Sequence, residues 1–280
     1  MERIAIIQMT SSAEPAANLA AIQRGCEQAA KQGAKLVVTP ENALLFADKQ
    51  AYHQHAEVLG EGPLQRALAQ LAKRQQITLV VGSMPIRSAT GVTTTSLVFA
   101  PDGERLGHYS KLHMFDVDVA DGHGSYRESD SFQPGNEICV VETPVGKLGL
   151  SICYDLRFPA LYQALREQGA QIILVPAAFT AVTGEAHWEV LLRARAIETQ
   201  TWVIAAGQGG QHSAKRETWG HSMVIDPWGS VVAQLPQQGD LLVAEIDLAY
   251  SEKIRQNMPV AQHGRFTHLL NKKQSQAYEY

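Results

Sequence analysis

The stretch Leu148-Gly-Leu-Ser-Ile-Cys-Tyr-Asp-Leu-Arg-Phe-Pro159 decides the fold class of this chain. The apolar run from Val145 to Ile152 predicts a short buried strand that leads directly to Cys153. The chain then turns and is predicted to enter a helix near Pro159. A thiol at the carboxyl end of a strand, just before a helix, lies where open α/β folds place their chemistry. We therefore interpret Cys153 as a candidate nucleophile, although a free cysteine is more commonly a small buried hydrophobic residue.

Length and composition predict a soluble globular protein with one α/β domain or two small ones. With 280 residues, 45% hydrophobic and 19% charged, the chain can bury a large core and has an ordinary globular composition. A net charge of −4 and the lack of a basic block argue against nucleic-acid binding. No apolar run approaches the ~20 residues of a membrane span, and the N-terminus resembles a strand more than a signal peptide. Cys26, Cys139 and Cys153 are too widely spaced for a disulfide framework or a zinc site, so we expect a reducing cytoplasm.

Predicted strands and helices alternate through the first half of the chain. Asp102-Gly103 separates two strand-like runs, a strong signal for a β-hairpin. Helical spacing and a C-terminal glycine, Gly33, mark the first helix. The predicted strands are Arg3–Met9, Leu36–Thr39, Thr78–Gly82, Val92–Ala100 and Glu104–Ser110, and the predicted helices are Pro15–Gln32 and Pro63–Gln75.

The second half has the same style of organisation without a sequence repeat. Its predicted strands are Ile138–Thr143, Val145–Ile152, Ile172–Pro176, Trp202–Gly207, Ser222–Asp226, Val231–Leu235 and Leu241–Asp247, and its helices are Pro159–Gln168, Ala186–Thr199 and a last one through Asn257. We interpret Gly207–Gly210 as a flexible turn. The absence of a linker predicts a single domain over residues 1–265 with a polar tail over 266–280. Hairpins interleaved with helices predict mixed sheets, two of them stacked with helices outside.

Two further strand ends carry charged residues. Glu41 follows the strand that ends at Thr39, and Lys111 follows the strand that ends at Ser110. Either residue alone would most simply be a charged group that meets water at the end of a strand. Together with Cys153 they supply a base, a cationic donor for an oxyanion and a nucleophile, which are the parts that thiol-dependent amide hydrolysis requires.

With these residues the sequence resembles the nitrilase superfamily of carbon–nitrogen hydrolases, whose triad is Glu, Lys and Cys in that chain order. The matching motifs are Thr39-Pro-Glu-Asn42, Tyr109-Ser-Lys-Leu-His113 and Ile152-Cys-Tyr-Asp-Leu-Arg157. The resemblance implies a four-layer αββα sandwich of two mixed sheets flanked by helices, which dimerises through its helices. It also implies that Glu128 is the superfamily's additional glutamate, which orients the substrate and the triad lysine. Otherwise Glu128 is an acidic loop residue.

Within the superfamily, the string from Ala178 to Glu198 resembles the deaminated-glutathione amidase branch. The resemblance implies cleavage of deaminated glutathione to 2-oxoglutarate and cysteinylglycine, which is a metabolite-repair reaction. The similar ω-amidase branch, which acts on 2-oxoglutaramate or 2-oxosuccinamate, stays open, as does a hydrolase of N-carbamoyl amines. A catalytically silent binding scaffold is the alternative from another functional class.

The expected chemistry is that of a cofactor-free amidase with a small-molecule substrate. Glu41 is expected to take the proton of Cys153, while Lys111 and the backbone N–H of Tyr154 hold the oxyanion. Lys111 is expected to lower the pKa of the Cys153 thiol, with burial and Glu41 opposing this effect.

Residues near these strand ends are expected to bind the substrate. Arg157 is a candidate for binding a substrate carboxylate, since arginine binds carboxylates with two parallel hydrogen bonds, or else it forms an internal salt bridge. Phe179 and Thr180 are expected to line the pocket.

No metal site is predicted. The acidic segment that begins at Asp116 resembles a calcium loop, but its third acid is displaced and Arg127 occupies the place of the bidentate glutamate. His187-x-Glu189 lacks the cysteine pair of a zinc deaminase.

Overall fold

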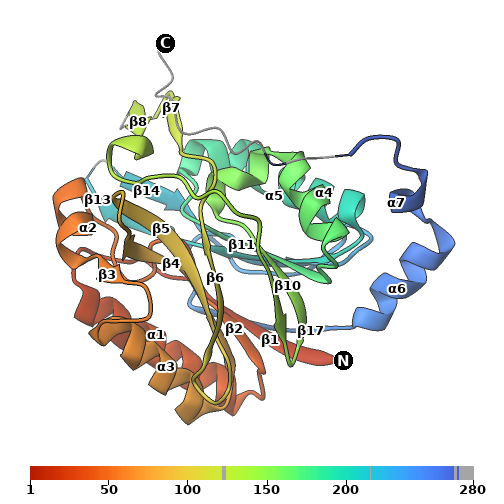
Figure 1. The fold of residues 1–280 in the computed structure, drawn as a ribbon, viewed down its shortest axis with the longest axis horizontal. Coiled ribbons are helices and arrows are strands. Elements are labelled where there is room, and N and C mark those ends of the chain that lie inside the picture. Colours follow the sequence, from red (N-terminus) through yellow and green to blue (C-terminus); the bar gives the residue numbers. More distant parts are fainter. Residues whose placement is uncertain (122–123, 215, 268–269, 271–280) are drawn as a thin grey trace.

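The strands of the computed structural model form two mixed sheets, stacked face to face between helices (Figure 1). The structure describes residues 1–121, 124–214, 216–267 and 270. The first sheet has the order β17-β1-β2-β4-β5-β6, and β3 pairs with β4. Its strands are β1 (Glu2–Ile7), β2 (Leu36–Val38), β3 (Glu57–Val58), β4 (Thr78–Arg87), β5 (Val92–Phe99), β6 (Arg105–Ser110) and β17 (Leu241–Ile246).

The second sheet has the order β16-β15-β12-β11-β10-β9. Its strands are β9 (Val140–Thr143), β10 (Gly146–Leu150), β11 (Ile172–Ala177), β12 (Trp202–Gly207), β15 (Met223–Ile225) and β16 (Val231–Gln234). Both sheets have a parallel centre, β1-β2-β4 in one and β10-β11-β12 in the other, with antiparallel strands outside it. The short β3 is the exception, since it pairs with β4 in parallel. Because β6 is antiparallel to β5, which is antiparallel to β4, the strands β2, β4 and β6 all run in one direction.

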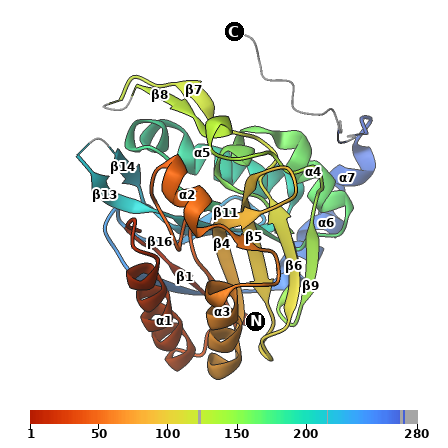
Figure 2. The same ribbon diagram turned by 60° about the vertical axis from the view of Figure 1, so that its left-hand side comes forward.

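Helices cover the outer face of each sheet. The helices α1 (Pro15–Lys31) and α3 (Pro63–Gln75) lie on the first sheet, and α4 (Pro159–Glu167) and α5 (Ala181–Thr199) lie on the second (Figures 1 and 2). Strand β1 shows why, since Ile4 and Ile6 belong to the core between the sheets while Ala5 and Ile7 pack with the helices. The predicted αββα sandwich is therefore confirmed.

The remaining elements are short and several of them gather at one edge of the sheets. They are α2 (Lys49–His55), the ribbon of β7 (Asp116–Asp118) and β8 (Ser125–Arg127), the 3-10 helices η1 (Glu128–Asp130) and η2 (Cys153–Arg157), the ribbon of β13 (Gly209–Ser213) and β14 (Arg216–Trp219), and the C-terminal helices α6 (Leu248–Asn257) and α7 (Val260–His263). None of the helices in the described ranges is long and apolar enough to cross a bilayer.

Two predictions about local structure are wrong. The glycine-rich segment 207–210 is the end of β12 and the start of β13, and a Cβ on Gly209 would lie 2.2 Å from the carbonyl oxygen of Gln237. Its glycines therefore permit close packing of backbone, not flexibility. Helix α5 begins at Ala181 and not at Ala186, because the Thr180 side chain accepts a hydrogen bond from the Thr183 N–H and caps the helix. The predicted polar tail, 266–280, falls mostly outside the described residues.

Candidate active site

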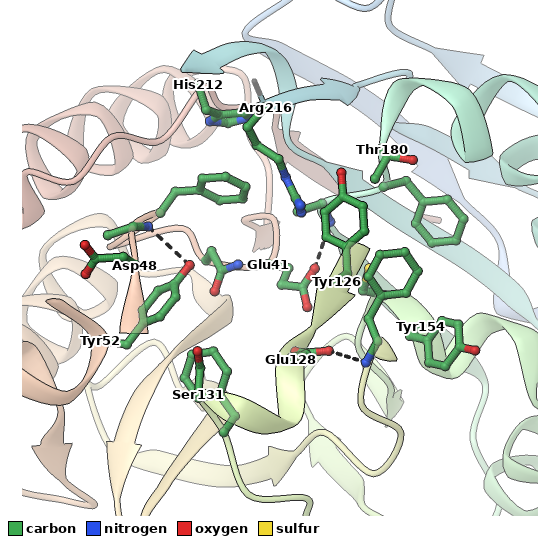
Figure 3. A pocket seen from close by; sticks show the side chains of 18 of the residues that line it. Glu41, Asp48, Tyr52, Tyr126, Glu128, Ser131, Tyr154, Thr180, His212 and Arg216 are labelled. Carbon is green, nitrogen blue, oxygen red and sulfur yellow. Dashed lines mark hydrogen bonds between the residues drawn. The ribbon is translucent and has the colours of Figure 1, made fainter. Parts of the chain in front are cut away.

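The three predicted strand ends converge on one cavity. Glu41 follows β2, Lys111 follows β6 directly, and Cys153 begins η2 after β10. The cavity has a volume of about 840 Å³ (Figure 3). Strands β2 and β6 run in one direction in the first sheet, so Glu41 and Lys111 emerge at one edge of it, and Cys153 joins them from β10 of the second sheet, which is stacked on the first.

Lys111 lies at the centre of a buried charge cluster. Its Nζ donates to Glu41 Oε1 at 2.8 Å and to Glu128 Oε1 and Oε2 at 2.9 and 2.8 Å, and the residue is only 1% exposed. Burial alone would lower the pKa of Lys111, but the carboxylates of Glu128 and Glu41 outweigh it and hold that pKa well above its ordinary value. Lys111 is therefore a permanent cation at neutral pH.

Glu128 reaches this cluster from η1, which directly follows the β7–β8 ribbon. Its Oε2 also accepts a hydrogen bond from the Phe115 N–H at 2.7 Å. Burial raises the pKa of Glu128, and the opposing charge of Lys111 only partly offsets this effect. Glu128 therefore contacts Lys111 directly, and its role in orienting the substrate stays a prediction.

Glu41 is held from the second sheet. The Ala178 N–H, at the end of β11, donates to Glu41 Oε2 at 2.9 Å, and Gln208 Nε2 donates to the Glu41 carbonyl oxygen at 2.9 Å. Gln208 is fully buried and also donates to Ser11 Oγ at 2.7 Å. Gln208 is not predicted from the sequence, where its only signal is a polar residue directly after a buried apolar strand.

Cys153 adopts a left-handed backbone conformation, with φ at +50°. This conformation is strained for a residue with a Cβ, and such strain is typical of functional sites. Burial, together with the neighbouring Glu41 charge and its hydrogen bond, raises the pKa of the Cys153 thiol well above its ordinary value. Lys111 acts in the opposite direction but does not prevail. The expectation of a lowered thiol pKa is wrong, because burial outweighs the lysine, and the resting thiol is neutral.

Asp155 connects the motif Tyr109–His113 to the motif Ile152–Arg157 by hydrogen bonds. It was not predicted as a key residue. Its carboxylate accepts hydrogen bonds from the Tyr109 hydroxyl at 2.7 Å, the His113 N–H at 3.1 Å and the Ile152 N–H at 2.9 Å, and it contacts His113 Nδ1 at 2.7 Å. The residue is fully buried. Asp155 therefore fixes the segment that carries Lys111 against the turn that carries Cys153.

We expect Asp155→Ala to lower the free energy of unfolding by about 3 kcal/mol, because several buried donors lose their acceptor at once. Urea denaturation measures this change. Asp118→Ala is the control, since Asp118 pairs with Arg127 at an exposed ribbon and its loss should have little effect. A cost for Asp155→Ala as small as that of the control would contradict the role of Asp155.

The predicted substrate-positioning residues line one wall of the cavity. The Arg157 guanidinium lies 5.9 Å from the Tyr154 ring centre and 5.3 Å from that of Phe179, and its Nη1 contacts His187 Nδ1 at 3.3 Å. Within the described residues Arg157 has no ion pair with a carboxylate, so the internal salt bridge considered as an alternative is not formed. Thr180 lines the wall beside Phe179, and its hydroxyl is engaged in capping α5.

Comparison with known proteins places this geometry in a family. A model of the carbon–nitrogen hydrolase family matches residues 3–256. The deaminated glutathione amidase of Yersinia enterocolitica is 51% identical over 270 residues, covering 95% of this chain and 94% of that protein. An omega-amidase of Danio rerio is 38% identical over 263 residues, covering 94% of each.

A solved structure agrees with both sequence comparisons. The crystal structure of Saccharomyces cerevisiae Nit3, a member of branch 10 of the nitrilase superfamily, superimposes with a TM-score of 0.85 and 31% identity. The match covers 95% of this chain and 97% of the yeast chain. The chain belongs to the carbon–nitrogen hydrolase family, within the nitrilase superfamily.

Proposed function

We propose that the chain is a deaminated-glutathione amidase, which cleaves the 2-oxo acid form of glutathione to 2-oxoglutarate and cysteinylglycine. The buried Glu41–Lys111–Cys153 cluster in a substrate-sized cavity carries the proposal of amide hydrolysis. The identity to deaminated glutathione amidases, 51% for the Yersinia protein, supports the choice of substrate. The biological role is then metabolite repair.

In the acylation step, the Glu41 carboxylate takes the thiol proton as the Cys153 sulfur attacks the amide carbon. A base is needed because the buried thiol is neutral at rest. The Lys111 ammonium and the backbone N–H of Tyr154, at the start of η2, stabilise the oxyanion. The C–N bond then breaks, the proton on Glu41 passes to the leaving amine, and a thioester remains.

In the deacylation step, Glu41 takes a proton from water, and the resulting nucleophile attacks the thioester carbon. The C–S bond breaks and the same proton returns to the Cys153 sulfur, so that the resting enzyme is restored. The hydrogen bonds from Ala178 and Gln208 keep Glu41 in one place through both steps. Glu128 orients Lys111 and is a positioning residue. These steps need no cofactor.

The second candidate is an ω-amidase, which the 38% identity to the zebrafish omega-amidase favours. The two activities are separated by kcat/KM measured on deaminated glutathione, 2-oxoglutaramate and an N-carbamoyl amine. We expect deaminated glutathione to be the best substrate. A tenfold or greater preference for 2-oxoglutaramate, equivalent to about 1.4 kcal/mol in the transition state, would assign the chain to ω-amidase activity.

We also propose that the protein forms a homodimer through α5. Val182, Val190 and Ile197 on this helix are 47%, 62% and 52% exposed, and Trp228 is 57% exposed. Apolar side chains exposed in this number along one helix are typical of an interface. Light scattering is expected to give the mass of a dimer, and Val190→Asp should shift it towards the monomer.

A further inference from the structure

Two arginines in the cavity wall have no carboxylate partner among the described residues. Lys111 is neutralised by two glutamates, and Arg127 pairs with Asp118 at 3.0 Å. Arg157 and Arg216 line the cavity and form no such ion pair. The substrate-binding role considered for Arg157 leaves Arg216 unexplained.

Arg216 lies against aromatic rings other than those that Arg157 contacts. Its guanidinium extends from β14 and lies 4.6 Å from the Tyr126 ring centre and 5.3 Å from that of Phe46. It also interacts with the Tyr126 hydroxyl, which itself donates to Asp121 at 2.8 Å. Figure 3 shows the Arg216 side chain directed from the β13–β14 ribbon towards Tyr126, at the cavity that contains Glu41 and Glu128.

One donor of Arg216 is unsatisfied. The Nε atom is buried and has no hydrogen-bond partner in the described structure. A buried N–H is rarely left unpaired, because desolvation without a replacement hydrogen bond is costly. This Nε is enclosed by the surrounding side chains. The rest of the charged side chain lines the cavity without a carboxylate partner among the described residues, and an anionic ligand is the partner that such a guanidinium binds.

The neighbouring His212 adds no second cation to this wall. Burial lowers the pKa of His212, and the charge of Arg216 adds to the effect. Both ring nitrogens are already engaged, with the Ser11 carbonyl oxygen at 2.8 Å and with Thr218 Oγ1 at 2.8 Å. His212 instead stacks on Phe46 with the ring centres 4.1 Å apart, and so supports the surface on which Arg216 lies.

We propose that Arg216 binds a second substrate carboxylate, the one on the leaving amine, while Arg157 binds the carboxylate next to the ketone. The substrate class is therefore amides with one carboxylate on each side of the scissile bond. This inference rests on the proposed function, since deaminated glutathione carries its second carboxylate on the glycine residue of the leaving dipeptide. 2-Oxoglutaramate has no such group and would leave Arg216 unpaired.

The test compares deaminated glutathione with its analogue in which the glycine carboxylate is a carboxamide. For the unmodified protein we expect kcat/KM to be about 10- to 100-fold higher for the acid, in the range of a charge-assisted pair. Arg216→Gln should remove this preference by raising KM for the acid and leave kcat/KM for the carboxamide within about threefold. Arg216→Lys, which keeps the charge but loses the planar fork, should retain part of it.

Arg157→Gln is the matched control, because both substrates keep the 2-oxo carboxylate. It should lower kcat/KM for both substrates by the same factor and preserve the preference for the acid. Thermal unfolding of each variant checks that the fold is intact.

The outcomes separate this inference from the proposed function. Equal losses on both substrates in Arg216→Gln would make Arg216 a structural support of the wall and overturn the inference. Equal rates of the unmodified protein on acid and carboxamide would also overturn it, although the amidase function would stand. If only 2-oxoglutaramate is hydrolysed, both the inference and the proposed function are wrong.

Discussion

Cys153→Ala is expected to abolish amide hydrolysis, with a fall in kcat of at least about 10⁴-fold, while the protein stays folded. The side chain lost is small and lies at the cavity wall, so the expected cost in stability is about 1 kcal/mol. Steady-state kinetics and thermal unfolding measure the two effects. Appreciable turnover in Cys153→Ala would refute the proposed mechanism, and a silent scaffold would show no turnover in the unmodified protein either.

The two other cysteines provide the controls for this experiment. Cys26 is fully buried between the first sheet and its helices, where burial raises the pKa of its thiol to about 12. Cys139 is half-buried just before β9, outside the residues that line the cavity. Cys26→Ala and Cys139→Ala should both keep their activity, although the former creates a small void in the core.

Lys111→Met should lower kcat well over 100-fold, because it removes a cationic donor from the oxyanion, and one such donor contributes about 10²–10³-fold. Alkylation of Cys153 at neutral pH should also slow. Lys111 lowers the pKa of that thiol, and without it burial and Glu41 are opposed only by the hydrogen bond with the Ala178 backbone. Mass spectrometry after iodoacetamide treatment measures the alkylation rate. Unchanged alkylation in Lys111→Met would show that the lysine does not influence the thiol.

The same variant should lose more stability at pH 7 than at pH 4. Burial already raises the pKa of Glu128, and removal of Lys111 takes away the charge that lowers it. A carboxyl group whose pKa is higher in the folded state than in the unfolded state is destabilising once pH exceeds its unfolded value. Urea denaturation at the two pH values tests this sign, and a penalty equal at both values would contradict it.

The sequence predicts the general position of the site because the ends of the strands can be recognised from the residue pattern. Apolar runs predict the strands that precede Glu41 and Cys153, and the Asp102-Gly103 hairpin predicts the strand that precedes Lys111. That the two sheets stack so that these strand ends meet follows from the fold that the resemblance implies. The resemblance to the superfamily adds Glu128, which lies in a short 3-10 helix where periodicity carries no information.

What could not be predicted depends on contacts between distant segments. Asp155 acts by accepting hydrogen bonds from residues more than 40 positions away, and Gln208 acts across the interface of the two sheets. The left-handed backbone conformation at position 153 could not be predicted, because the residue there is a cysteine and not the glycine that usually marks this conformation. Its thiol pKa depends on how deeply the cavity encloses the sulfur, and no spacing of residues measures this.

The neutral resting state of Cys153 has a consequence for survival of the protein under oxidative stress. Peroxides and disulfides react with thiolates. Cys153 is protonated at rest and only 7% exposed, so its reaction with them should be slow. The sulfur becomes a strong nucleophile only when a substrate carbonyl is in place and Glu41 removes the proton. The resting enzyme would thereby resist oxidation between turnovers, and slow formation of sulfenic acid at Cys153 in dilute peroxide would be the measurable sign.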